Sequence, residues 1–341
     1  MTKPARFSFA VLAATLVLVG FLHLGGPLLA LLFSYFALTR LGGFIRNKWL
    51  ALAVFLLVVA GLAYASVHFT RAAITALPKI AENSIPAATA WAQAREIELP
   101  FTDFESLKNV AMDALKEQVH YLRNFANFAR NATTLIVFVL IGVVAAVSLF
   151  FNSQLDIFPE SHAVRHNLYS ICCDEISARF REFYNSFATV MGAQMTISCI
   201  NTVLTSIFVL ASGLPYAPFI IGITFLCGLV PIVGNVVSNT VIVFVGFLVS
   251  PRVAIGALVF LVVIHKLEYF LNSKIIGDRI RNPIWLTFFG LIVGEKLMGI
   301  PGMILAPVVL NYLRVEMSKI EVDPPIAASE HMTIDPVDRR S

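Results

Sequence analysis

Charge is what this sequence has least of. Only 13% of its 341 residues are Asp, Glu, Lys or Arg, against roughly 25% in soluble domains. Residues 183–251 carry no charge at all, and 58% of the chain is apolar. An uncharged run of this length has no polar face to offer water, so its solvent must be lipid. The composition therefore excludes a water-soluble domain.

Other signals are also missing. The cysteines are Cys172, Cys173, Cys199 and Cys227, with no CxxC or His/Cys metal spacing, so we expect reduced thiols and no metal site. There is no Walker A sequence and no kinase or hydrolase motif. We therefore expect a protein that is not an enzyme, has no cofactor and does not use ATP. A net charge of +4 gives no reason to expect nucleic-acid binding.

The apolar runs that remain predict the fold class. Each membrane-spanning helix needs about 20 apolar residues, and lipid requires every backbone polar group to be bonded internally. No ten-residue alternating pattern suggests a barrel. We predict an all-α polytopic membrane protein in the lipid bilayer, with about eight membrane elements that include two helix-break-helix hairpins.

Composition divides the chain into four parts. Charge returns after the first spans, where Thr102 and Glu105 form a capping-box pattern ahead of an apolar stripe. That region either packs on another part of the protein or captures a ligand. The packing partner is the membrane domain or a second subunit, so a homo-oligomer is possible. The predicted parts are N-terminal spans at 1–70, an amphipathic helical region outside the membrane at 71–132, a core membrane domain at 133–314 and a disordered tail at 315–341.

Two apolar segments are interrupted by proline and glycine. They are residues 216–249 and 284–313. Such breaks are tolerated at membrane depth only where backbone is buried in protein or faces a watery cavity, and they indicate a transporter's binding site. We expect non-helical backbone at Pro231, Gly234, Gly299, Pro301 and Gly302.

Uncharged polar residues follow the first break. Asn235, Ser238, Asn239 and Thr240 lie on the next helical segment. Amide and hydroxyl groups beside freed carbonyls suit a polar solute or sodium, although the same groups also hydrogen-bond helices together. Asn201, Thr202 and Thr205 are expected to face the same cavity.

Ionisable groups in apolar sequence are functional candidates. Glu295 either carries a proton or cation during transport, or pairs with Lys296 at the tip of the second hairpin. Glu268 is the other candidate carrier, and its neighbours His265 and Lys266 also suit a membrane surface.

Basic residues indicate the orientation. Lys3 and Arg6, then Arg40, Arg46 and Lys48, fall on the same side when the predicted spans are counted. Because basic short loops stay in the cytoplasm, we expect both termini there and residues 71–132 outside.

Three motifs in the last third carry a family resemblance. They are LVPIVG at 229–234, NSKIIG at 272–277 followed by Asn282-Pro283, and GEKLMGIPGMILAP at 294–307. They resemble signatures of the autoinducer-2 exporter family of bacterial and archaeal membrane proteins, with Ser273 and Pro307 departing from its pattern. The layout of spans is also similar.

The resemblance implies a multi-pass protein of the bacterial or archaeal cytoplasmic membrane. The family includes exporters of a small quorum-sensing sugar derivative and members that look like sodium/proton antiporters. We therefore expect a secondary transporter that exports a small polar solute. The alternatives are an antiporter of a monovalent cation, and a membrane scaffold that docks a partner through residues 71–130.

Overall fold

The computed structural model describes residues 3–96, 125–152, 167–230, 233–276 and 283–319, and within them it contains helices and no strand. The predicted all-α class is confirmed, whereas the capping box at Thr102 lies outside the described residues. The helices are α1 Lys3–Phe21, α2 Gly25–Phe44, α3 Lys48–Gln93, α5 Phe125–Phe151, α6 Leu168–Ala211, α7 Ala217–Gly228, α8 Val233–Val249, α9 Pro251–Ile276, α10 Ile284–Met298 and α11 Ile300–Ser318.

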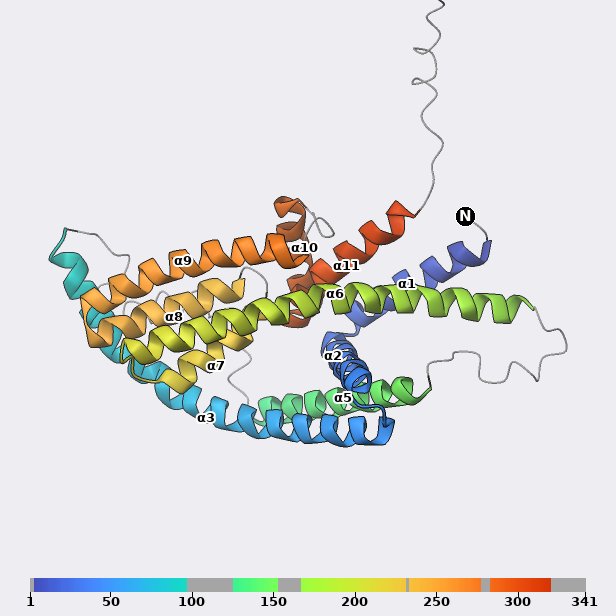
Figure 1. The fold of residues 1–341 in the computed structure, drawn as a ribbon, viewed down its shortest axis with the longest axis horizontal. Helices are drawn as coiled ribbons and strands as arrows, with labels where there is room; N and C mark the ends of the chain where they lie inside the picture. Colours follow the sequence, from blue (N-terminus) through green and yellow to red (C-terminus); the bar gives the residue numbers. More distant parts are fainter. Residues whose placement is uncertain (1–2, 97–124, 153–166, 231–232, 277–282, 320–341) are drawn as a thin grey trace, which may run out of the picture.

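Helix α6 runs through the middle of the molecule (Figure 1). Its first half packs against α1, α2 and α11, and its second half against α7 and α9. One cluster of buried apolar side chains packs against each half of α6. The first contains Leu12, Leu32, Phe187, Met191, Leu305 and Val308; the second contains Ile80, Val209, Phe219, Ile220, Ile242 and Leu261. A third, smaller cluster joins α2 to α3 and α5.

Helix α3 is much longer than the span expected at its start. It is continuous from Lys48 to Gln93 and runs through Pro78 and Pro86. Its second half packs on α8, where Ile85 and Ala88 are buried and the Trp91 and Phe247 rings lie 5.9 Å apart. This packing compensates for the backbone hydrogen bonds that proline removes from a helix. The boundary expected at residue 71 therefore lies inside one helix that belongs to the bundle.

Both expected hairpins are present. α7 ends at Gly228 and α8 begins at Val233, while α10 and α11 meet at Gly299, whose φ of 65° lies in the left-handed region. The second break is narrower than expected, because Pro301 and Gly302 already belong to the first turn of α11. Proline is favoured there, since a first-turn N–H has no helical partner.

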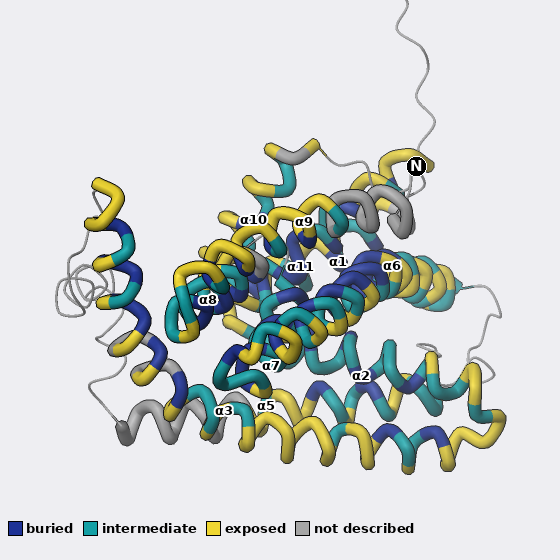
Figure 2. The backbone as a smooth tube through the Cα atoms, turned by 60° about the vertical axis from the view of Figure 1, so that its left-hand side comes forward, coloured by how far each residue is buried: buried dark blue, intermediate teal, exposed yellow. Residues whose placement is uncertain are grey.

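Many large apolar side chains are exposed on the outer surface of the described helices. Among the described residues, four helices are long and apolar enough to cross a membrane: Gly25–Phe44, Lys48–Ala76, Leu168–Ala211 and Ile300–Ser318. Large side chains such as Leu57, Tyr64 and Phe289 are exposed, and Figure 2 shows exposed residues along α3 and α5. Because soluble monomers rarely expose such extensive apolar surface, these faces suit lipid. The fold is that of a polytopic membrane protein.

Candidate functional site

A row of polar side chains is buried along the second half of α6. Gln194, Ser198, Asn201 and Thr205 are each at most 9% exposed. Their spacing of four, three and four residues places them on one face of the helix. We call this row the α6 polar seam. It lies within the charge-free part of the chain and faces the first helical hairpin.

Two seam residues bind the end of α7. The Gln194 side-chain amide donates to the Gly228 carbonyl at 2.6 Å, and the Ser198 hydroxyl donates to the Phe225 carbonyl at 2.8 Å. The last carbonyls of a helix have no partner within that helix. The break after Gly228 therefore frees backbone acceptors, and α6 supplies the donors that satisfy them.

The next seam residue is not satisfied in the same way. The side-chain oxygen of Asn201 is buried and has no hydrogen-bond partner within the described part of the chain. A buried amide without its partner costs about 1–3 kcal/mol. Asn201 is 4% exposed, so bulk solvent does not offset this cost. The seam therefore holds an available acceptor one helical turn from the capped end of α7.

Close backbone contact seals the first hairpin. A Cβ on Gly234 would collide with the Cys227 carbonyl, and one on Gly228 would collide with the Ser198 side chain. Glycine is required where backbones approach this closely. The second hairpin is built in the same way, because Gly302 lies against the Gly294 carbonyl. Pro231 lies outside the described residues.

The polar residues expected on α8 divide between two faces. Ser238 is buried in the packed face, whereas Asn239 and Thr240 line an open hollow of about 500 Å³ between α8 and α9. His265 and Lys266 lie at the same hollow, which is otherwise lined by apolar side chains. The backbones of Asn235 and Glu268 belong to α8 and α9, and their side chains lie outside the described residues. Among the described side chains, Ser238 therefore lies on a different face from Asn239 and Thr240.

Glu295 lies near the tip of the second hairpin, and its side chain is 46% exposed and 3.6 Å from the Lys296 ammonium. Of the two interpretations offered by the sequence, this geometry agrees with an ion pair at the surface. Sequential neighbours point in different directions around a helix, but long side chains at an exposed end can still reach each other. Within the described residues, no group of three or more His, Cys, Asp or Glu suits a metal ion.

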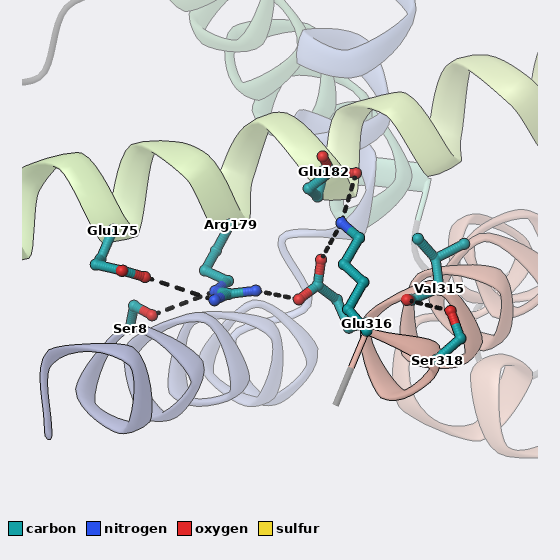
Figure 3. Close-up of polar contacts among 8 residues, drawn as sticks. Ser8, Glu175, Arg179, Glu182, Val315, Glu316 and Ser318 are labelled. Atoms are coloured by element: carbon teal, nitrogen blue, oxygen red, sulfur yellow. Dashed lines mark hydrogen bonds and ion pairs between the residues drawn. The ribbon is translucent and has the colours of Figure 1, made fainter. Parts of the chain in front are cut away.

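A charge network that sequence reasoning missed joins three helices (Figure 3). Arg179 of α6 donates to Glu316 of α11, and its guanidinium also reaches Glu175 at 3.5 Å and the Ser8 hydroxyl of α1 at 3.4 Å. Lys319 lies 3.1 Å from Glu316 and 3.4 Å from Glu182. The Glu316 side chain is only 2% exposed, and its two cationic partners compensate that burial.

The sequence contained part of the seam. Asn201, Thr202 and Thr205 were expected to face one cavity. Asn201 and Thr205 are buried, whereas Thr202 is half-buried. Gln194 and Ser198 were missed, although the recurrence of polar residues every three or four positions in charge-free sequence would have found them. The Arg179–Glu316 pair has no such signal, because 137 positions separate its members.

Comparison with known proteins agrees with this architecture. The family model "AI-2E family transporter" matches residues 7–320, which is nearly the whole chain. The chain belongs to the AI-2E transporter family. The matched range includes both hairpins, the α6 polar seam and the charge network.

Two proteins that are similar to this AI-2E family chain come from Bacillus subtilis (strain 168). "Putative transport protein YdbI" is 30% identical over 145 residues, which are 41% of this chain and 41% of that protein. "Putative transport protein YueF" is 33% identical over 130 residues, which are 37% of this chain and 35% of that protein. The aligned part thus spans about two fifths of the first relative and about a third of the second.

Proposed function

We propose that this AI-2E family chain is a secondary transporter that exports a small polar solute of the autoinducer-2 kind without ATP. The observation that carries the proposal is the α6 polar seam, where Gln194 and Ser198 bind freed carbonyls and the Asn201 oxygen remains available. The family membership and the two similar transport proteins support the same class.

The chemistry of the seam suits a neutral solute rich in hydroxyl groups. Hydroxyl donors can bind the Asn201 oxygen and can compete with Gln194 and Ser198 for the carbonyls of Gly228 and Phe225. Such an exchange keeps every buried polar group partnered while solute moves. The seam contains no charged residue, so it offers no counter-ion to a charged solute.

Solute flux through purified protein tests the proposal. The protein is reconstituted in liposomes with labelled autoinducer-2 as the probe, under sodium, proton or no gradient. Wild type is expected to transport the probe, and Asn201→Leu is expected to reduce transport at least tenfold. Ser206→Ala is the matched control, because Ser206 lies on the same helix and, within the described residues, its hydroxyl donates to the Thr202 carbonyl of α6 itself. Equal flux in wild type and in Asn201→Leu would contradict the role of the seam.

A sodium/proton antiporter is the second candidate. The observation that favours it is that Asn201 presents an oxygen acceptor close along α6 to backbone carbonyls, and oxygen ligands suit hard cations. Sodium-dependent proton movement without flux of the probe would favour this candidate. No flux of either kind, together with a partner captured by residues 71–130, would favour a membrane scaffold.

We also propose that the protein lies in the cytoplasmic membrane of a bacterium or archaeon with both termini inside. The positive clusters at Arg40, Arg46 and Lys48 support this orientation. A cysteine at the exposed Glu96 is the outside reporter. In a background without native cysteines, an impermeant thiol reagent applied to intact cells should label position 96 and leave position 329 unlabelled. The reverse pattern would overturn the orientation.

A further inference from the structure

A second hollow, of about 520 Å³, lies between α2 and α6 and away from the seam. Its lining combines an arginine with small and hydroxyl-bearing side chains and includes Phe36, Arg40, Thr189, Gly192, Ala193 and Thr196. No Cβ fills the space at Gly192, where the nearest atom to an added Cβ is the Phe36 ring at 3.7 Å. This small surface on α6 leaves room that a larger side chain would occupy.

The two walls of the hollow are held beside it by aromatic and hydroxyl contacts. The Tyr184 hydroxyl and the Thr39 hydroxyl are 2.7 Å apart, and the Tyr35 and Tyr184 rings are 4.7 Å apart. Phe36 also packs edge-on against Phe187 at 6.5 Å. These contacts fix α2 against α6 next to the hollow, so its shape is part of the fold.

Arg40 provides an uncompensated positive charge at this hollow. Its guanidinium lies 5.3 Å from the centre of the Phe36 ring, which fixes its position by a cation–π contact. Within the described part of the chain, no carboxylate forms an ion pair with it. Arg46 and Lys48 follow closely in sequence, so the local field favours an anion and disfavours a second cation.

The position of Arg40 indicates that the anion belongs to a membrane lipid. Arg40 lies near the end of α2, which is apolar and long enough to cross a membrane. Its guanidinium is therefore expected at the depth of the lipid headgroups. The rest of the hollow extends along α6 past Ala193. Basic pockets between membrane helices bind anionic lipid headgroups. A free phosphate would use Arg40 but would leave the apolar part of the hollow empty.

A hydroxyl-bearing headgroup also fits the hydroxyls of the wall. Thr189 donates its hydroxyl proton to the Asn185 carbonyl at 2.8 Å, so its oxygen retains lone pairs for a donor from outside. We propose that this hollow binds a phospholipid with an anionic, hydroxyl-bearing headgroup, such as phosphatidylglycerol. The phosphate binds Arg40, a headgroup hydroxyl donates to Thr189, and an acyl chain follows the small surface at Gly192.

Lipid binding to the full-length protein, measured by native mass spectrometry in detergent, tests this site. Phosphatidylglycerol and phosphatidylcholine with identical acyl chains are compared for wild type, Arg40→Gln, Arg46→Gln and Gly192→Leu. Wild type should bind phosphatidylglycerol more tightly. Arg40→Gln should reduce that affinity about tenfold, as expected for loss of a hydrogen bond to a charged group. Arg46→Gln removes the same charge outside the hollow and should change the affinity less than twofold, because it contributes only to the general field.

Three results would overturn the site. Equal losses in Arg40→Gln and Arg46→Gln would indicate diffuse attraction to the basic cluster. Displacement of the lipid by inorganic phosphate at equal concentration would indicate a phosphate site. Unchanged lipid binding in a Gly192→Leu variant that elutes and unfolds like wild type would show that the hollow is not occupied, because the leucine side chain fills it.

Discussion

Near its beginning, α6 meets α1 and α11 through charged side chains, whereas near its end it meets α7 through uncharged ones. Arg179 and Glu316 lie between helices with partners on several sides. Gln194 and Ser198 bind backbone carbonyls instead. The two regions are built on one continuous helix. The seam is buried throughout, whereas the network surrounds the buried Glu316 with partly exposed partners.

The charged side chains of the network all have partners, whereas one side-chain atom of the seam has none within the described residues. Glu316 accepts from Arg179 and Lys319, and Glu182 and Glu175 supply further partners to those cations. The seam, in contrast, leaves the Asn201 oxygen without one in the described residues. A fully partnered network fastens helices together, and an available acceptor gives a polar solute somewhere to bind. The two regions should therefore respond differently to substitution.

The largest effect is expected from Glu316→Gln. It leaves the partly buried Arg179 without its main counter-ion, which should lower the free energy of unfolding by about 3 kcal/mol. Denaturant titration in detergent measures it. Glu182→Gln is the matched control, since Glu182 is 35% exposed and pairs with an exposed Lys319, and should cost less than about 1 kcal/mol. Equal losses of unfolding free energy in the two variants would show that the charge network does not hold the helices together.

The next effect concerns the hairpin that the seam binds. Gly234→Ala places a methyl group against the Cys227 carbonyl and should cost about 2 kcal/mol through overpacking. Gly256→Ala is the control, because nothing lies within 4 Å of a Cβ there, and alanine is favoured over glycine in a helix by about 1 kcal/mol. The same titration should give opposite signs for the two variants. A stabilising Gly234→Ala would mean that the hairpin is more open.

A smaller cost is expected within the seam. Gln194→Leu removes the donor to the Gly228 carbonyl and leaves that acceptor buried, which should cost about 1.5 kcal/mol. Thr196→Val is the control on the same helix, because in the described part of the chain the Thr196 hydroxyl donates to the Gly192 carbonyl of α6 itself. If both variants have the same free energy of unfolding as wild type, the hydrogen bond from α6 does not stabilise the end of α7.

The smallest effect should have the opposite sign. Asn201→Leu replaces a buried amide whose oxygen lacks a partner, so the protein should become about 1 kcal/mol more stable. A stability gain together with lost transport would separate the seam from the charge network most sharply. A loss of stability would show that the Asn201 side chain, like that of Glu316, makes interactions that stabilise the fold.

Much of the fold followed from local sequence. Absence of charge and the length of the apolar runs predicted helices in lipid, and proline and glycine predicted where both hairpins turn. The positive φ of Gly299 agrees with that prediction. Pro78 and Pro86 lie inside a continuous α3, which packing against α8 supports.

The candidate site followed from the sequence only in part. The first break lies beside α6, where Asn201 and Thr205 are buried. Gly234 and Gly302, which were expected to be non-helical, lie in the first turns of α8 and α11, where they make close backbone contacts. Asn239 and Thr240, however, line a hollow on a different face from the buried Ser238. A one-residue step turns a helix by about 100°, so the face that packs inward depends on neighbouring helices.

The sequence by itself determined the solvent, the secondary structure and the turning points, because these depend on residues adjacent along the chain. Only the tertiary structure decided which polar groups are partnered. Gln194 reaches Gly228 across 34 positions, and Arg179 reaches Glu316 across 137. Hydrogen bonds and ion pairs act over a few ångströms, so partners this distant in sequence are fixed only when helix packing brings them together.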